Sequence, residues 1–211
     1  MYREIRRLFA DVGKRRPDVH AVVLAPEGPH FCAGNDLDEF MTMDGDNARE
    51  RMFDVREAFY AIQGCAVPVI GAVHGAALGT GLAIAASCDF VVASADARFG
   101  LPELTVGVLG AEEMAQVGAI AEVVPREELL ATAQQMAAKV ARHSPTAIRV
   151  GKHALDRIET MDLRAGYEFE QSWTGWMSDH PDAKEAIRAV RERRMARYRP
   201  VTSPPTLDRP S

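Results

Sequence analysis

The chain has 211 residues, of which 47% are hydrophobic and 26% are charged, with a formal net charge of −5. These values are typical of one globular domain with room for a helical appendage, and they exclude a globally basic nucleic-acid-binding protein. No apolar run is long enough to span a bilayer, and residues 1–7 lack the apolar core of a signal peptide. Three cysteines without CxxC spacing argue against a disulfide framework and a structural zinc site, so we expect a cytoplasmic protein that binds no metal.

The first half of the chain alternates predicted helices and strands. Helices are expected over residues 2–16 and 47–63, because their apolar residues recur at helical spacing. Apolar runs bounded by turn residues predict buried strands over residues 19–24, 68–73 and 90–93. This alternation favours an α/β core with parallel strand pairing.

The second half is predicted to be helical. Helices are expected over residues 127–142, 145–158, 163–177 and 182–195, and Ser144-Pro145 is a good start for the second of them. The chain then divides into three parts, which are an α/β core over residues 1–125, a helical region over residues 126–197 and a tail over residues 198–211. The tail is rich in proline, serine and threonine, so it is expected to be flexible.

Three glycines, Gly75, Gly79 and Gly81, lie where the 68–73 strand gives way to small, helix-prone residues. Glycine allows positive φ and close approach of the backbone, and the first turn of a helix leaves N–H groups unpaired. The junction therefore predicts a site for a negatively charged oxygen. Common nucleotide and nucleophile motifs are excluded, because Ile84 stands where GxGxxG requires glycine and neither GxxxxGK nor GxSxG occurs.

A second bend with the same chemistry lies around Ala33 and Gly34, also after a predicted strand. Two backbone N–H groups that converge on one oxygen form an oxyanion hole, which suits acyl chemistry in which a carbonyl becomes an enolate. Such chemistry also needs an acid or base, and Glu103 lies in a third bend. Burial near Phe99 and Leu101 would raise the pKa of this carboxyl towards a useful range.

Four ordered motifs carry a resemblance to a known family. They are Phe31-Cys32-Ala33-Gly34-Asn35-Asp36-Leu37, then Gly75-Ala76-Ala77-Leu78-Gly79-Thr80-Gly81, then Cys88-Asp89, then Phe99-Gly100-Leu101-Pro102-Glu103 with Gly107. Over about residues 1–195 the chain resembles the enoyl-CoA hydratase/isomerase (crotonase) superfamily. The resemblance implies a ClpP/crotonase fold, which is a spiral of ββα units with a C-terminal helical trimerisation region, assembled as a homotrimer or homohexamer.

The resemblance also implies the roles of the site residues. The backbone N–H groups of Ala33 and Thr80 would form the oxyanion hole for an acyl-CoA thioester, and Glu103 matches the family's second catalytic glutamate. Ala83 stands where typical hydratases have the first glutamate, and an alanine cannot transfer protons. The substrate-binding residues implied by the motifs are Cys32, Gly34, Asn35, Asp36, Leu37, Leu78, Gly79 and Gly107. Coenzyme A, which is part of the substrate and not a cofactor, would lie along the Ala33 bend.

These residues leave the reaction open. We expect an acyl-CoA enzyme of fatty acid metabolism that acts as a hydratase, an isomerase or another crotonase-type lyase. With a single glutamate, a double-bond shift is chemically easier than hydration. The alternatives are a non-catalytic acyl-CoA-binding oligomer with an eroded site, and RNA binding through the basic face of residues 184–199. Neither a nucleic acid nor a membrane is the expected partner.

Several other side chains have structural interpretations. Asp36 is expected to cap the bend around Ala33, and His74 to make a fixed hydrogen bond. The cysteines are expected to fill the core. The aromatic residues expected to pack between subunits are Trp173, Trp176 and Tyr167.

The sequence departs from the family's pattern in two places. It starts in the first helix, without the two strands that usually precede it, and it runs from Leu109-Gly110 straight to Ala111 without the usual glycine-rich turn and helix. The first departure would leave the 19–24 strand with an open edge, which natural sheets avoid. We therefore expect that further residues belong before Met1 and after Gly110.

Overall fold

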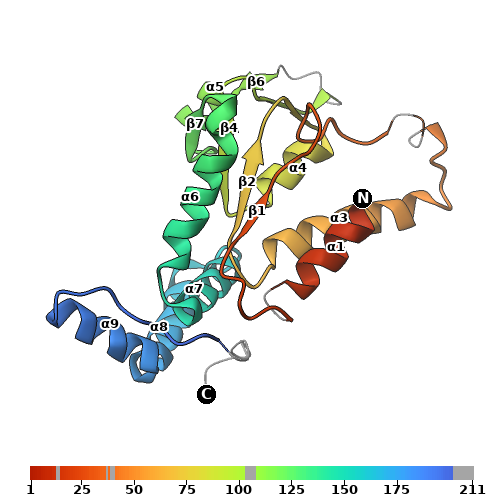
Figure 1. Cartoon of the computed structure of the whole chain (residues 1–211). Helices are drawn as coiled ribbons and strands as arrows, with labels where there is room; N and C mark the ends of the chain where they lie inside the picture. Colours follow the sequence, from red (N-terminus) through yellow and green to blue (C-terminus); the bar gives the residue numbers. More distant parts are fainter. Residues whose placement is uncertain (13–14, 37, 39–40, 103–107, 202–211) are drawn as a thin grey trace.

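The computed structural model describes residues 1–12, 15–36, 38, 41–102 and 108–201. Its centre is a four-stranded sheet in the order β1-β2-β4-β7, in which every neighbouring pair is parallel (Figure 1). The strands are β1 (Val22–Leu24), β2 (Val69–Val73), β4 (Phe90–Ser94) and β7 (Glu122–Val124). The parallel pairing confirms the predicted α/β core.

A second, smaller sheet lies beside the first. It consists of β3 (Ala76–Leu78), β5 (Arg98–Gly100) and β6 (Leu109–Gly110), with β3 parallel to β5 and β5 antiparallel to β6. The sequence predicts a bend over residues 74–81 and does not predict β3. Its alanines have low strand propensity, so pairing with β5 and Cys32 makes this segment a strand.

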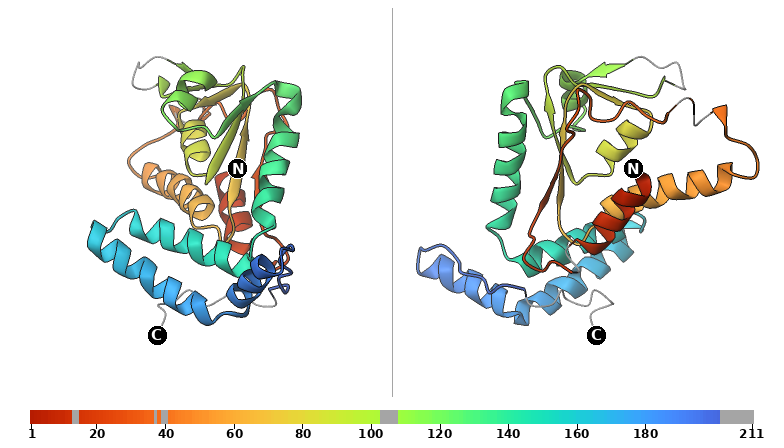
Figure 2. Two further views of the ribbon diagram at one scale, coloured as in Figure 1. Left: turned by 90° about the vertical axis from the view of Figure 1, so that its left-hand side faces the viewer. Right: turned by 45° about the vertical axis from the view of Figure 1, so that its right-hand side comes forward.

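Helices cover both faces of the central sheet (Figure 2). One face, with Ile70 and Val92, packs against α6, and Val69 on the other face packs against α1, α3 and α4. These helices are α6 (Leu129–Ala141), which follows a short 3₁₀ turn η2 (Arg126–Glu128), and α1 (Tyr2–Asp11), α3 (Ala48–Gln63) and α4 (Thr80–Ala86). All residues of β2 are buried, as expected for a parallel strand that is covered on both sides.

A further part of the core fills the space between the two sheets. Val73 and Val91 of the central sheet pack there against Ala77 and Phe99 of the smaller one. The short helix α5 (Ala111–Gln116), which follows β6 directly, closes this part of the core. The smaller sheet, which carries β3 and β5, is therefore fixed against the larger one.

Three more helices, α7 (Pro145–Ile158), α8 (Leu163–Asp179) and α9 (Pro181–Arg191), extend beyond the two sheets (Figures 1 and 2). An ion pair ties α7 to the sheet, because Nζ of the buried Lys152 lies 2.6 Å from Asp89 Oδ1. The other carboxylate oxygen of Asp89 accepts the Val69 N–H at 2.8 Å. The buried ammonium group of Lys152 thus has a charged partner, as burial requires.

Trp173 corrects an expectation about subunit packing. Its side chain is 2% exposed and packs against Val150 and Ala154 of the same chain. The prediction was wrong for this residue, because the sequence does not reveal which face of α8 lies against α7. Trp176 and Tyr167 are 37% and 65% exposed, so for them the prediction stands untested.

Some predicted helices and strands differ in length from those observed. α1 ends at Asp11 and not at residue 16, because Val12 has an extended backbone with φ −61° and ψ 134°. α9 ends at Arg191, and Arg193 adopts a left-handed φ of 52°. β1 lies at the sheet edge, with a strand on one side only among the described residues. Most of the predicted flexible tail lies outside the described residues.

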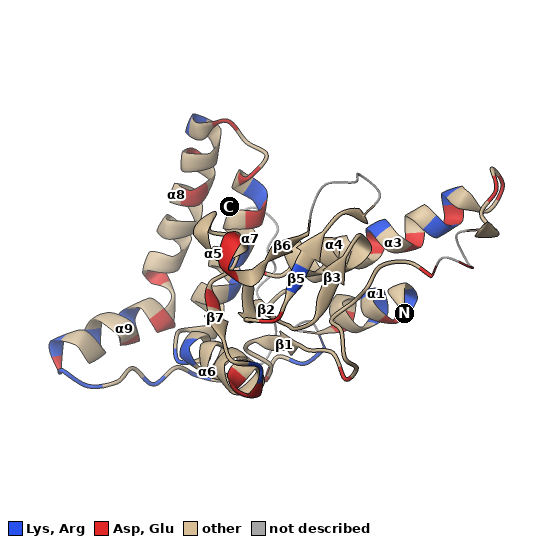
Figure 3. Cartoon of the chain, turned by 90° about the horizontal axis from the view of Figure 1, so that it is seen from above, with Lys and Arg blue, Asp and Glu red and all other residues tan. Residues whose placement is uncertain are grey.

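Charges of both signs are mixed over the surface, and Figure 3 shows them interspersed along α3, α8 and α9. Near the C-terminus, Glu185 lies 2.6 Å from Arg194 and 3.6 Å from Arg188. Hydrogen bonds, chiefly from Arg194, lower the pKa of Glu185 to about 2. This pairing reduces the basic character that RNA binding would need. None of the helices in the described part of the chain has the length and apolar character to cross a bilayer.

Candidate active site

The structure brings the two glycine bends side by side, although 45 residues separate Asn35 from Thr80. Cys32 forms a parallel bridge with Ala77 of β3. The Cys32 N–H donates to the Ala76 carbonyl, and the Leu78 N–H donates to the Cys32 carbonyl, both at 3.0 Å. The first bend therefore starts as an additional strand along β3, and the two chains leave the smaller sheet together.

Glycine is required where these chains meet. A Cβ atom on Gly81 would lie 1.9 Å from the Cys32 carbonyl oxygen, which is far inside van der Waals contact. Gly34 has φ 105°, and a Cβ there would lie 3.2 Å from the Leu78 carbonyl oxygen. Gly79 has φ 54°, which turns the chain from β3 into α4. The close approach of the two backbones thus explains the glycines that the sequence presents.

The bends offer backbone N–H groups to a ligand. Thr80 is the first residue of α4, where an N–H has no partner within the helix. Among the described residues, no acceptor lies within hydrogen-bond reach of the N–H groups of Thr80, Ala33 or Asn35. The Gly79 N–H, by contrast, donates to the Gly100 carbonyl at 2.9 Å. The junction can therefore bind an oxygen through main-chain donors.

A side-chain network links the two bends through Tyr2 of α1. The Tyr2 hydroxyl oxygen lies 2.5 Å from Asn35 Oδ1 and 2.9 Å from Thr80 Oγ1, and these two oxygens are 3.5 Å apart. The sequence analysis did not identify Tyr2 as a site residue. The sequence did contain a sign that Tyr2 points inward. Tyr2 precedes Ile5 by three positions, so the two residues lie on the same inward face of the helix.

The network also shows which described residue of the first bend contacts the Thr80 side chain. The prediction named Ala33, whereas the contacts with Thr80 come from Asn35, two residues later. Ala33 is exposed, and its neighbour Cys32 contacts Gly81 instead. The described contacts therefore favour the Asn35 end of the bend as the part nearest to Thr80.

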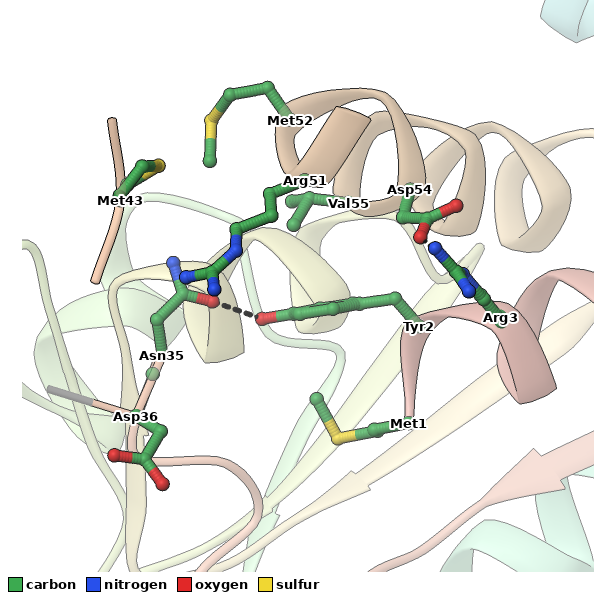
Figure 4. Close-up of a pocket in the computed structure, with 11 residues that line it drawn as sticks. Met1, Tyr2, Arg3, Asn35, Asp36, Met43, Arg51, Met52, Asp54 and Val55 are labelled. Atoms are coloured by element: carbon green, nitrogen blue, oxygen red, sulfur yellow. Dashed lines mark hydrogen bonds and ion pairs between the residues drawn. The ribbon is translucent and has the colours of Figure 1, made fainter. Parts of the chain in front are cut away.

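A pocket of about 470 Å³ adjoins this network (Figure 4). Its walls come from α1, the first bend and α3, and combine apolar with polar side chains. The lining residues are Met1, Tyr2, Arg3, Gly34, Asn35, Asp36, Met43, Arg51, Met52, Asp54 and Val55. This volume is in the usual range for a small-molecule site.

The remaining predicted residues fall into two groups. Cys32 and Leu78 are half-buried where the bends pair, and Asp36 is exposed, with Oδ1 accepting the Asp38 N–H at 2.9 Å in a local turn. Ala83 is half-buried on α4, one turn after Thr80. The other predicted site residues, Leu37, Glu103 and Gly107, lie outside the described residues.

Other reactive side chains nearby have structural contacts. His74 Nε2 lies 2.9 Å from the Gly28 carbonyl oxygen. Burial raises the pKa of the Cys88 thiol to about 12, so this group is a protonated core residue at neutral pH. Within the part of the chain that the structure describes, histidine, cysteine and acidic side chains do not gather into a metal site.

The chain matches the family model described as enoyl-CoA hydratase/isomerase over residues 2–110 and 108–200. It is similar to the "(7aS)-7a-methyl-1,5-dioxo-2,3,5,6,7,7a-hexahydro-1H-indene-carboxyl-CoA hydrolase" of Rhodococcus jostii, with 36% identity over 81% of this chain and 76% of the relative. It is also similar to the 2,3-dehydroadipyl-CoA hydratase of Escherichia coli, with 31% identity over 83% of this chain and 79% of the relative.

Solved structures of similar fold include DspI of Pseudomonas aeruginosa. The two share 29% identity with a TM-score of 0.88, over 94% of this chain and 86% of that one. An enoyl-CoA hydratase of Mycobacterium smegmatis is 26% identical with a TM-score of 0.87, over 93% of this chain and 87% of that one. The whole architecture, and not only the motifs, is therefore shared with these proteins.

The contact between Gly81 and Cys32 yields a stability prediction. Gly81→Ala must separate the two bends, so we expect its free energy of unfolding to fall by about 3 kcal/mol or more in urea denaturation. Gly151→Ala is the matched control, because a Cβ there meets nothing within 4 Å. As an exposed position within α7, it should gain about 0.5–1 kcal/mol. Equal stabilities of the two variants would contradict the described contact.

Proposed function

The chain belongs to the enoyl-CoA hydratase/isomerase family, and we propose that it stabilises the enolate of an acyl-CoA thioester between the two glycine bends. The observation that supports this most is the meeting of the bends, where main-chain N–H groups lack acceptors among the described residues. A thioester oxygen gains negative charge when the neighbouring carbon loses a proton. Fixed N–H donors stabilise that charge, and removal of one such donor typically costs about 10²–10³ in turnover.

The Thr80 N–H is the donor that we propose from the second bend. For the first bend, the sequence suggested the N–H of Ala33, which, like that of Asn35, has no acceptor among the described residues. Asn35 Oδ1 lies 3.5 Å from Thr80 Oγ1, and both side chains meet at Tyr2. We therefore place the thioester oxygen between Thr80 and the bend formed by residues 33–35.

Glu103 is the proposed acid and base, on the strength of its motif alone. Its carboxylate would remove a proton from C2 of a 3-enoyl-CoA, and the electron pair would move to the thioester oxygen as the enolate forms. Return of the proton to C4 would then give the 2-enoyl-CoA. This double-bond shift needs one carboxylate, whereas hydration by the family's two-glutamate route needs a second at the position of Ala83.

The relatives widen the set of reactions to test. The Escherichia coli relative is named as a hydratase and the Rhodococcus jostii relative as a hydrolase, so both reactions belong beside isomerisation in an assay. Each of these acts on a CoA compound by its name. Turnover of 2-enoyl-, 3-enoyl- and 3-hydroxyacyl-CoA esters would identify the reaction, and conversion of none would contradict this set of proposed reactions.

Assembly into a homotrimer or homohexamer is a further part of this proposal. Large apolar side chains remain exposed on the C-terminal helices, among them Leu155, Leu163, Tyr167, Ile187 and Val190. Such exposure is characteristic of surfaces that a partner covers. Light scattering should give three or six times the chain mass of 23.1 kDa. A monomeric mass would contradict the assembly.

The proposal also includes a role for α5, the helix that follows Gly110 directly. The family match divides at residues 108–110, where the sequence lacks the turn and helix that the resemblance implies. In the structure, β6 passes directly into α5, and the Gly110 N–H donates to the Glu113 carboxylate at 2.6 Å. We propose that α5 takes the place of a longer wall beside the substrate. The expectation of additional residues after Gly110 stays untested.

Glu103→Gln tests the catalytic role. The amide cannot accept the proton, so we expect turnover to fall by about 10²-fold or more while the dissociation constant for the CoA ester changes little. Glu127→Gln, at an exposed position of η2, is the matched control and should leave turnover unchanged. If Glu103→Gln keeps full turnover, another acid-base group takes the place of Glu103, whereas absence of turnover by the native protein would favour the non-catalytic acyl-CoA-binding alternative.

A further inference from the structure

The first bend has few bonds of its own at the point where it faces Thr80. Its last backbone hydrogen bonds are the two that join Cys32 to β3. From Ala33 to Asn35, no backbone group of the bend has a hydrogen-bond partner among the described residues. This lack of partners makes the N–H groups available to a ligand. It also means that side-chain contacts must hold this part of the bend in place.

Tyr2 supplies such a contact to both bends with a single oxygen atom. Its hydroxyl donates to Asn35 Oδ1 at 2.5 Å and lies 2.9 Å from Thr80 Oγ1. A hydroxyl group can donate one hydrogen and accept others, so one phenol oxygen can take part in both bonds. Figure 4 shows the Tyr2 ring reaching from α1 to Asn35. The phenol therefore joins one side chain from each bend to a common point.

The helix that carries Tyr2 is itself fixed in the fold. Phe9 of α1 is 2% exposed and belongs to the same part of the core as Val69 of the central sheet. Arg3, the neighbour of Tyr2, donates to Asp54 of α3 at 2.5 Å. A tyrosine side chain has only two rotatable torsions, so little freedom remains for its hydroxyl once the helix is fixed. The hydroxyl is thus a fixed point against which the bends can be held.

We propose that Tyr2 is a positioning residue of the oxyanion site. It acts through Asn35 and Thr80, and it holds the main-chain N–H groups of the two bends at the separation that the thioester oxygen needs. The inference rests on the proposed function, which places this oxygen between Thr80 and residues 33–35. Negative charge builds up on the oxygen only as the enolate forms. The spacing of the donors therefore affects turnover far more than it affects binding of the ester.

Tyr2→Phe tests the inference, because it removes the hydroxyl and keeps the ring that lines the pocket. We expect kcat to fall about 10- to 100-fold, since a displacement of about 1 Å at a reacting centre has effects of this size. KM should change little, because the ester binds before the charge develops. Tyr60→Phe, at an exposed position of α3, makes the same chemical change and should keep the native kcat. A native kcat in Tyr2→Phe, with or without a change in KM, would overturn the inference.

A second measurement does not depend on how much of the variant is folded. The infrared band of a thioester carbonyl moves to lower frequency when N–H donors polarise the bond. The probe is butyryl-CoA with an isotopic label at the thioester carbonyl, which has no double bond to shift or to hydrate. Its band should lie lower on the native protein than in water, and it should return towards the position in water on Tyr2→Phe. The same band position on both proteins would overturn the inference.

Thr80→Val tests whether Tyr2 acts through its proposed partner. Valine has nearly the shape of threonine and lacks Oγ1. If the two side chains act as a unit, the double variant Tyr2→Phe/Thr80→Val should lose much less turnover than the product of the two single losses. Losses that multiply in full would show that Tyr2 acts independently of Thr80, and would overturn the inference.

The inference and the proposed function fail in different ways. If the native protein polarises the carbonyl and Tyr2→Phe does so equally, the inference is overturned and the proposed oxyanion site stands. If the native protein leaves the carbonyl band of the bound probe where it lies in water, the proposed oxyanion site is overturned, and the inference with it.

Discussion

At Gly81, the backbone of α4 lies against the Cys32 carbonyl so closely that a Cβ atom would stand 1.9 Å from the oxygen. This contact fastens two bends that are distant in the sequence. The first bend is bridged through Cys32 to β3 and the second bend follows β3, and the smaller sheet packs in turn on the buried parallel sheet. The spacing of the N–H groups thus depends on the core behind them, and fixed donors of this kind would stabilise an oxyanion in the way that we propose.

The bends proposed to bind the thioester oxygen and the pocket beside them come from different layers of the fold. The bends extend from strands in the interior, whereas the pocket is bounded by α1 and α3 at the periphery. Tyr2 joins the two, since its hydroxyl reaches both Asn35 and Thr80. Side chains on the outer helices can therefore change the shape of the pocket without moving the proposed oxyanion donors. This division agrees with a family whose members differ in reaction and substrate.

The helices, strands and bends that have a repetitive pattern or a glycine motif could be predicted from the sequence. The helical spacing of residues 47–63 and the apolar run before the glycines match α3 and β2 closely. The glycine motifs also identified the two bends, because close backbone approach permits few residue types. β3 could not be predicted, since its alanines become a strand only through pairing with distant segments.

Contacts between helices and bends that are distant in the sequence could not be predicted either. The roles of Tyr2 and Trp173 depend on which helix faces meet, and local periodicity reveals a face without its partner. The choice between Ala33 and Asn35 depends on how the chain turns at Gly34, where φ is 105°. A motif alone does not give the direction of each N–H group. The sequence therefore predicted the two bends, and the structure shows that they meet.

The most direct test of the oxyanion site is a crystal structure with a bound acyl-CoA that reacts slowly or not at all. The account predicts that the thioester oxygen lies about 2.7–3.1 Å from the backbone nitrogen of Thr80 and from a backbone nitrogen of the Ala33–Asn35 bend. A thioester oxygen bound away from Thr80, with no main-chain donor in reach, would contradict the account.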